Sequence, residues 1–237
     1  MSIKEIISNK WNSKRVQKII RKPRRMMRAY KEGKIFKEIS GIVHVGANRG
    51  QESALYAKFD LDVLWVEPIP EVYEQLVGNI KKHKKQKAIQ ALITDVDDQT
   101  YQFNIANNNG ASSSILQLKE HKEIWPHVHF NKTISLQSIT LSSLYKQQKI
   151  APAKYQALVM DTQGSELLVL KGSLPLLKYF KFIKTEVADF EAYEGCCQLN
   201  DINEFMVSNG FKEYFRQQFA KPTKAGGKYF NVIYVSN

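Results

Sequence analysis

Cysteine is almost absent from this chain of 237 residues, and the two that occur, Cys196 and Cys197, are adjacent. Neighbouring cysteines do not form a disulfide framework and lack the CxxC spacing of a metal site, so we expect two reduced thiols in a loop. Long apolar runs are also lacking, and none approaches the roughly 20 residues of a membrane-spanning helix. The N-terminus shows neither the apolar core nor the cleavage site of a secretory signal. We therefore expect a globular protein that resides in the cytoplasm.

Acidic residues are scarce only at the start of the chain. The net charge is +12, and residues 1–40 hold thirteen Lys or Arg against three Asp or Glu, whereas the remainder holds 22 basic and 20 acidic residues. We therefore divide the chain into a basic helical N-terminal extension, 1–37, and a domain, 38–237. Because the domain is nearly neutral, a site built around a polyanion is disfavoured.

The extension has an apolar stripe, since Ile3, Ile6, Ile7 and Trp11 recur every three to four residues. Lys and Arg occupy the other faces, and Pro23 interrupts the pattern. One interpretation is an amphipathic segment that lies on an anionic membrane surface or another polyanion, peripheral to the membrane. The other is a helix pair that packs against the domain with a solvated basic face. Charge does not decide between them.

From Glu38 onward, strands and helices alternate. Apolar runs typical of buried strands occupy 39–45, 62–66, 88–93, 155–160 and 180–187. Helical patterns occupy 51–59, 70–83, 165–171 and 201–209. This alternation predicts an α/β fold with a mostly parallel, seven-stranded sheet. No helix separates the last two strands, 211–217 and 228–235, so we expect them to pair as an antiparallel hairpin.

The segment 97–150 does not follow this alternation of strands and helices, and we interpret it as a substrate-side insertion. It contains two expected strands, 101–105 and 133–139, a turn-rich stretch that includes Ser112–Ser114, and a short helix at 141–148. Additions at the carboxyl edge of a sheet lie over the site, so we expect acceptor-binding residues here. The candidates are Ser113, Ser114, Trp125 and, from a later loop, Tyr193. His127 and His129 lack a third ligand, so no metal site is predicted.

Three sequence features mark a ligand site at the carboxyl ends of the strands. The first is a strand-to-helix turn, His44 to Gly50, in which Gly46 and Gly50 permit close backbone approach without the GxGxxG spacing of a pyrophosphate site. The second is Glu67, which ends the second strand 21 positions after Gly46 and is placed to bind both ribose hydroxyls. A helix N-cap or surface carboxylate is the alternative. The third is Asp161, at the end of the fourth strand.

The fifth predicted strand adds Lys184 and Glu186 at an equivalent height. We expect these two side chains to converge with Asp161 on the rim of the site. Asp161 and Glu186 are candidate general bases. Lys184 either orients a substrate atom or lowers the pKa of a carboxylate, and a structural salt bridge between Lys184 and one of the acids is the alternative.

Together these motifs resemble the FkbM family of methyltransferases. The resemblance lies in Val45–Gly50, Glu67–Pro68 with Asn79, the run Asp161–Glu166, the pair Ser113–Ser114 and Glu186, and it covers residues 40–235. It implies a Rossmann-like class I methyltransferase fold with S-adenosylmethionine as the cofactor. The cofactor-binding residues it implies are His44, Gly46, Ala47, Asn48, Gly50, Glu67, Pro68, Leu92 and Asp161. His44 departs from the family pattern, which has Asp at this position.

The resemblance also implies O-methylation of a hydroxyl, commonly on a sugar of a glycan or secondary metabolite. One alternative is an RNA ribose 2′-O-methyltransferase with the basic extension on phosphates, but the neutral domain makes nucleic acid a less favoured partner. The other is a non-catalytic module with a methyltransferase fold that tethers a partner through its extension. A nicotinamide dehydrogenase is excluded by the glycine spacing and the terminal hairpin.

Overall fold

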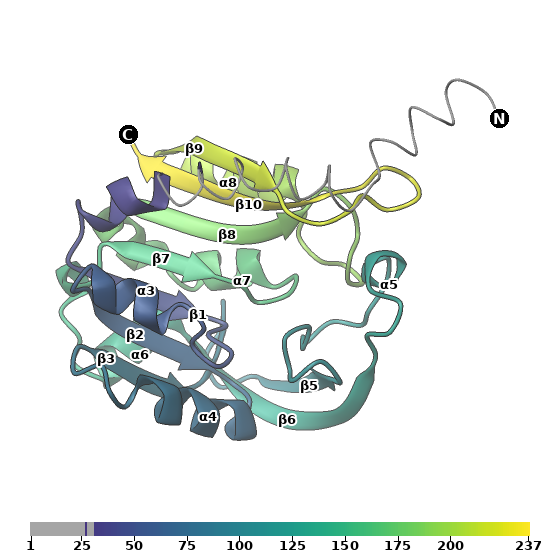
Figure 1. Cartoon of the computed structure of the whole chain (residues 1–237), viewed down its shortest axis with the longest axis horizontal. Helices are drawn as coiled ribbons and strands as arrows, with labels where there is room; N and C mark the ends of the chain where they lie inside the picture. The colour runs from purple at the N-terminus through teal and green to yellow at the C-terminus, as the bar shows by residue number, and fades with distance from the viewer. Residues whose placement is uncertain (1–26, 28–30) are drawn as a thin grey trace. The chain divides into compact units, whose positions relative to one another are not determined.

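The computed structural model describes Met27 and residues 31–237 (Figure 1). The chain divides into two compact units between Glu38 and Ile39, and all elements named below belong to the second unit. The predicted apolar stripe of the extension and its break at Pro23 lie outside the described residues. Within the described part of the chain, no helix has the length and apolar character needed to cross a membrane.

A seven-stranded sheet forms the centre of the second unit. Its strands, in spatial order, are β3 (Gln86–Gln90), β2 (Asp62–Glu67), β1 (Gly41–Val45), β7 (Ala157–Met160), β8 (Phe182–Ala188), β10 (Tyr229–Ser236) and β9 (Phe211–Gln218). The pairs from β3 to β8 are parallel, whereas β10 runs antiparallel to both β8 and β9. The predicted mostly parallel sheet with a terminal antiparallel hairpin is therefore confirmed, and the hairpin places its second strand inside the sheet.

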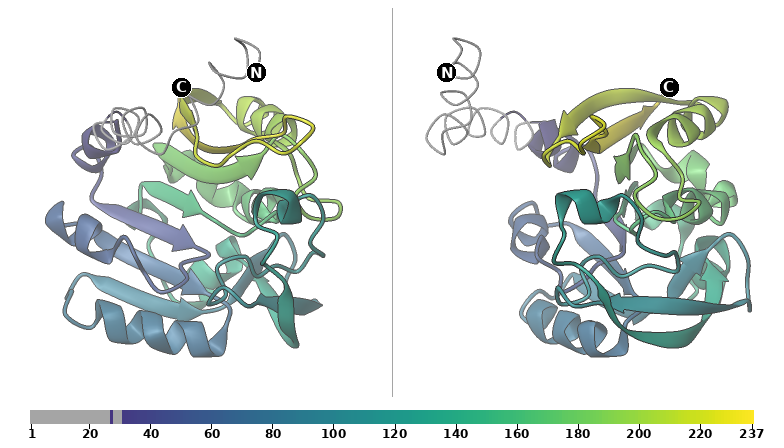
Figure 2. Two further views of the ribbon diagram at one scale, coloured as in Figure 1. Left: turned by 45° about the vertical axis from the view of Figure 1, so that its right-hand side comes forward. Right: turned by 90° about the vertical axis from the view of Figure 1, so that its right-hand side faces the viewer.

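Helices cover both faces of this sheet, as Figure 1 and the turned views of Figure 2 show. One face carries α3 (Ser53–Lys58) and α4 (Pro70–Ile80), and the other carries α6 (Leu141–Gln147), α7 (Glu166–Lys171) and α8 (Leu199–Ser208). The main core lies on the second face, where strand residues such as Val43, Leu64 and Leu158 pack against these helices. Burial on both faces explains why the central strands read as continuous apolar runs.

The predicted single strand at 88–93 is wrong. The chain forms two strands there, because β2 ends at Glu67 opposite Gln90 and leaves no partner beyond that point. The next residues form β4 (Leu92–Thr94), which pairs with β6 (Phe130–Thr140) in a second sheet of order β4-β6-β5. A long antiparallel ladder joins β6 to β5 (Thr100–Ala106), as the two strands predicted in the insertion require.

The remaining elements are short. The insertion carries α5 (His121–Ile124), and two 3-10 helices, η1 (Pro152–Lys154) and η2 (Leu174–Tyr179), flank β7 and α7 in the sequence. Helix ends follow local signals: Pro70 occupies the first turn of α4, and Gln198 and Asp201 form a capping box at the start of α8. Gly210 takes a φ of +81° directly after the C-cap of α8, as expected for glycine at this position.

Candidate active site

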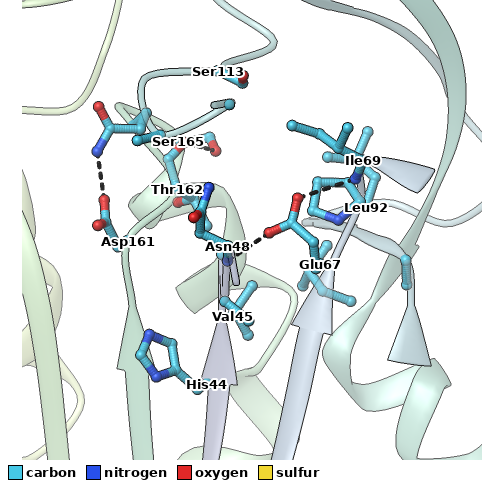
Figure 3. A pocket seen from close by; sticks show the side chains of 18 of the residues that line it. His44, Val45, Asn48, Glu67, Ile69, Leu92, Ser113, Asp161, Thr162 and Ser165 are labelled. Atoms are coloured by element: carbon cyan, nitrogen blue, oxygen red, sulfur yellow. Dashed lines mark hydrogen bonds between the residues drawn. The ribbon is translucent and has the colours of Figure 1, made fainter. Parts of the chain in front are cut away.

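A cavity opens at the carboxyl ends of β1, β2 and β7 (Figure 3). From β1 the sheet continues to β2 on one side and to β7 on the other, and open α/β sheets bind ligands at such a switch point. The insertion contributes Phe103, Gly110, Ala111 and Ser113 to the lining of the cavity. The lining residues used below are His44, Gly46, Ala47, Asn48, Glu52, Glu67, Pro68, Ile69, Leu92, Phe103, Ser113, Asp161, Gln163 and Ser165.

The loop after β1 passes close to the end of β7. Gly46 has a φ of +75°, and a Cβ at this position would collide with the carbonyl group of Asp161. The N–H groups of Gly46 and Ala47 both donate to the carbonyl of Val66, at 3.0 and 3.1 Å. Asn48, with a φ of +45°, completes the turn. The predicted cofactor residues Gly46, Ala47 and Asn48 therefore line the cavity with backbone.

Gly50 lies outside the cavity and lines a separate surface hollow. Its φ is +69°, and an added Cβ would lie 2.7 Å from Leu76 Cδ1, so glycine is required for packing against α4. Asn79 Nδ2 donates to the carbonyl of Arg49 over 2.9 Å from the same helix. Gly50 and Asn79 thus both shape the loop after β1.

Glu67 is fixed by backbone hydrogen bonds to both of its oxygens (Figure 3). The N–H of Asn48 donates to Oε2 over 2.7 Å, and the N–H of Ile69 donates to Oε1 over 3.1 Å. Burial raises the pKa of Glu67 to about 7 despite these donors. Each oxygen keeps lone pairs for a ribose hydroxyl. The alternative of a helix N-cap does not hold, because the N-cap of α4 is Ile69 and no side chain caps it.

Beside Glu67, the cavity wall is apolar. Ile69, Leu92 and Phe103 form one cluster of buried side chains, and Pro68 also lines the wall. An apolar wall next to a fixed carboxylate suits a nucleoside, with the base on the wall and the ribose on the acid. Leu92 and Pro68 were predicted here, whereas Phe103 was missed because its strand belongs to the second sheet.

The charges around the cavity suit a cationic ligand. Glu52, Glu67 and Asp161 line it, and its described lining includes no Lys or Arg. Proteins commonly bind a pyrophosphate with Lys or Arg side chains or with the backbone of a GxGxxG loop, and the lining contains neither. S-adenosylmethionine carries a sulfonium and an adenosine and no phosphate, so these residues fit it. Glu67 would hold its ribose, and the loop Gly46–Asn48 would face its amino-acid end.

The loop after β7 is shaped by Glu166, whose carboxylate is buried. It accepts hydrogen bonds from the backbone N–H of Thr162 at 2.9 Å and of Gly164 at 3.0 Å. Burial raises its pKa to about 7. These hydrogen bonds explain the motif Asp161–Glu166: Glu166 fixes the loop that follows Asp161. The sequence pattern includes Glu166 in the motif but does not indicate this role.

Asp161 lines the cavity at the end of β7, as predicted (Figure 3). Gln163 Nε2 donates to Asp161 Oδ1 over 2.5 Å. Burial raises the pKa of Asp161 to about 6, with the Gln163 hydrogen bond and the charge of Lys184 acting in the opposite direction. A half-buried carboxylate with a pKa raised toward neutral pH suits a general base. Gln163 was not among the predicted site residues.

Glu186 and Lys184 do not line this cavity. Glu186 lines a smaller one beside it, together with Tyr193 and Tyr229, and Gln163 borders both cavities. Lys184 lines neither cavity, although its charge lowers the pKa values of Asp161 and His44. Asp161 is therefore the predicted catalytic residue that faces the donor cavity, and the catalytic roles of Lys184 and Glu186 stay predictions.

The predicted acceptor residues hold the insertion together. Ser113 lines the cavity, but its hydroxyl accepts the N–H of Ala106 at 2.9 Å. Ser114 is fully buried, and its hydroxyl donates to the carbonyl of Gln163 at 2.8 Å. Trp125 lines neither cavity and packs in the cluster around Tyr229, with ring centroids 5.3 Å apart.

Tyr193 also belongs to this cluster, and its side chain is 1% exposed. It lines the smaller cavity and bonds to Gln163 through its hydroxyl. No contact with an acceptor follows from these positions, so acceptor binding by the four residues stays a prediction.

His44 occupies the base of the cavity as a neutral imidazole. Its ring stacks on Trp65 with a centroid distance of 4.9 Å, and Nδ1 lies 3.2 Å from the Tyr56 hydroxyl. Burial, reinforced by the charge of Lys184, lowers its pKa to about 3. A hydrogen-bonded aromatic cluster thus occupies the position where the family pattern has an acid.

Cysteine and exposed histidine form no metal site in the described residues. Cys196 and Cys197 are both free thiols in the loop after β8, as expected. His127 and His129 are exposed in a loop of the insertion. No group of three or more potential metal-binding side chains occurs in the part of the chain that the structure describes.

Comparison with known proteins identifies the family. The family described as "Methyltransferase FkbM domain" matches residues 44–213, and the chain belongs to this family. It is a methyltransferase that uses S-adenosylmethionine. It is similar to the 2-O-methyltransferase NoeI of Sinorhizobium fredii (strain NBRC 101917 / NGR234), with 25% identity over 199 residues, covering 80% of this chain and 81% of that protein.

Solved structures of methyltransferases are similar to this chain. The methyltransferase domain of METTL16 aligns with a TM-score of 0.50 and 11% identity over 84% of this chain, which spans 60% of that chain. A magnesium protoporphyrin IX methyltransferase from Synechocystis, with bound SAH, gives a TM-score of 0.48 and 7% identity over 83% of this chain and 73% of that one. The match to METTL16 supports the class I methyltransferase fold and carries no information on the acceptor.

Proposed function

We propose that this protein transfers a methyl group from S-adenosylmethionine to a hydroxyl, above all on a sugar of a glycan or secondary metabolite. The observation that carries the proposal is Asp161, a half-buried carboxylate that lines the donor cavity at the end of β7 and whose pKa is raised to about 6. An alcohol needs a base as it attacks, and a base that titrates near neutral pH is effective there. The similarity to NoeI, a 2-O-methyltransferase, supports oxygen as the acceptor atom.

The chemistry divides between the cofactor and the chain. S-adenosylmethionine supplies an electrophilic methyl group on a sulfonium. With the donor bound, Asp161 would take the proton of the acceptor hydroxyl. Glu67 and the loop Gly46–Asn48 hold the donor, and the insertion confines the acceptor. Much of the rate enhancement comes from alignment of the two reacting atoms.

A labelling assay tests the acceptor class. We would incubate the protein with methyl-tritiated S-adenosylmethionine and either neutral oligosaccharides or RNA oligonucleotides. The proposal expects label in an oligosaccharide, and less in the matched oligosaccharide that lacks its 2-hydroxyl. Label confined to RNA would favour the ribose 2′-O alternative and reject the glycan. Tight donor binding without label in any hydroxyl compound, but with label in amines or thiols, would reject O-methylation altogether.

A further inference from the structure

A chain of hydrogen bonds leads from Asp161 away from the donor cavity and into the insertion. Gln163 Nε2 donates to Asp161 Oδ1 over 2.5 Å, and the Tyr193 hydroxyl lies 2.7 Å from Gln163 Oε1 and 3.2 Å from the carbonyl of Ser112. The Ser112 hydroxyl in turn lies 3.2 Å from His121 Nε2. The chain joins three segments that are far apart in the sequence.

Gln163 can occupy its place in this chain in one orientation. An ionised Asp161 only accepts hydrogen bonds, so the amide must present its NH₂ group to the carboxylate. Its oxygen then faces the Tyr193 hydroxyl, which donates. The backbone of Gln163 has a φ of +53°, a conformation that non-glycine residues rarely adopt unless their surroundings hold it. Here the hydrogen bonds from Thr162 and Gly164 to Glu166 hold it.

Tyr193 is a rigid anchor for the amide. Its ring lies 5.2 Å from that of His121, and its backbone forms an isolated bridge with Leu118 of the insertion. His121 is fixed in turn, because its Nδ1 lies 2.7 Å from the Tyr229 hydroxyl on β10. A movement of Tyr193 would therefore disturb packing on the insertion and on the sheet.

We propose that Gln163, anchored by Tyr193, is a positioning residue that aims the Asp161 carboxylate at the acceptor hydroxyl. The amide occupies Oδ1 and leaves Oδ2 for the proton of the acceptor. The inference rests on the proposed function, in which Asp161 is the base. Gln163 acts through Asp161, and it also separates the donor cavity from the smaller cavity that contains Glu186.

The pKa of Asp161 provides a way to measure its interaction with Gln163. The charged or titratable groups that act on it, or on which it acts, come from several elements: Glu52, Glu67, Glu166, Lys184, Tyr193 and Tyr229. Of its interactions, the Gln163 hydrogen bond and the charge of Lys184 lower the pKa of Asp161. Loss of the hydrogen bond therefore moves the titration of Asp161 to higher pH.

The test compares two variants with one matched control. Gln163→Met keeps the length of the side chain and removes the amide, and Tyr193→Phe keeps the buried ring and removes the anchor. Tyr229→Phe is the control, because it removes a buried hydroxyl of the same cluster that bonds to His121 and not to Gln163. The titration of Asp161 is followed by NMR of protein labelled at aspartate Cγ, with Asp161→Asn to assign the signal.

We expect Asp161 to titrate at higher pH in Gln163→Met and Tyr193→Phe than in the wild type and in Tyr229→Phe. The kcat for the oligosaccharide acceptor falls about tenfold to a hundredfold in the first two variants, as expected for a misaligned base, while the KM for S-adenosylmethionine is unchanged. An unshifted titration with a wild-type kcat in both variants would overturn the proposal. So would a Tyr229→Phe variant that shifts equally. The NMR readout needs no acceptor, so it decides on Gln163 even if the proposed sugar substrate is wrong.

Discussion

The backbone N–H of Asn48 donates to Glu67 Oε2 across 2.7 Å, which joins the loop after β1 to the end of β2. The loop that we propose to face the donor's amino-acid end and the acid that we propose to bind its ribose are therefore held in one fixed geometry. Such preorganisation spares the protein the ordering of these groups on binding.

Replacement of Glu67 by Gln should weaken donor binding. The variant loses a charged acceptor and turns an NH₂ group toward a backbone N–H. Because hydrogen bonds to a charged group contribute about 1.5–3 kcal/mol, we expect the Kd for S-adenosylmethionine to rise by about 10- to 150-fold in calorimetry. Glu71→Gln is the control, since Glu71 is exposed and pairs with Lys132 outside the cavity. Equal affinities of both variants would remove Glu67 from the site.

Replacement of Gly46 by Ala should destabilise the domain. The added Cβ collides with the Asp161 carbonyl and the residue must keep a φ of +75°, so we expect a loss of about 3 kcal/mol or more in the free energy of unfolding. Gly195→Ala is the matched control, because Gly195 has a φ of +65° but nothing within 4 Å of its added Cβ. It should lose about 1–2 kcal/mol. Denaturant unfolding that finds equal losses would contradict the close approach.

Replacement of Glu166 by Gln should loosen the loop after β7. The Glu166 carboxylate accepts hydrogen bonds from two backbone N–H groups. In the variant one of them would face an NH₂ group, which should lower the free energy of unfolding of the loop by about 1–3 kcal/mol. Hydrogen exchange at the amides of Thr162 and Gly164 should therefore accelerate. Glu191→Gln provides the comparison, because its carboxylate accepts the N–H of Gly195 at an exposed site. Unchanged exchange in Glu166→Gln would show that this acid does not shape the loop.

The pH dependence of kcat should report Asp161. Its pKa of about 6 means that the carboxylate is ionised, and able to accept a proton, above that pH. We expect kcat to be constant above about pH 7 and to fall about tenfold per unit once the pH drops below the pKa of Asp161 in the donor complex, which the positive charge of the sulfonium keeps at or below about 6. Saturating S-adenosylmethionine is essential, because Glu67 titrates near pH 7 in the unbound protein and affects donor binding. A kcat that rises as pH falls through 6 would exclude Asp161 as the base.

Much of the fold was predictable because its central strands are buried on both faces. Runs such as Gly41–Val45 and Ala157–Met160 read as strands without further information. The break at Ala91 was not predictable, because the apolar run continues across it while the partner strand ends. The place of β10 inside the sheet likewise depends on long-range pairing that no local pattern encodes.

The residues of the site were likewise predictable only in part. Glu67 and Asp161 follow directly from their positions at strand ends, where parallel strands bring side chains together. The sequence predicts that Trp125 and Ser114 bind the acceptor, and this stays a prediction. In the structure they pack inside the insertion, whose shape depends on contacts such as His121 with Tyr229, 108 residues apart. Gln163 was missed because its role requires both Asp161 and Tyr193, which approach each other only in the folded chain.

The most direct test of the account is methyl transfer by Asp161→Asn, measured beside donor binding by the same variant. The account predicts that the asparagine variant still binds S-adenosylmethionine, weakened by no more than about tenfold because it loses one of the three carboxylates that line the cavity, while kcat for the oligosaccharide acceptor falls by about a hundredfold or more. Wild-type turnover by this variant, with binding intact, would contradict the assignment of Asp161 as the base and the mechanism built on it.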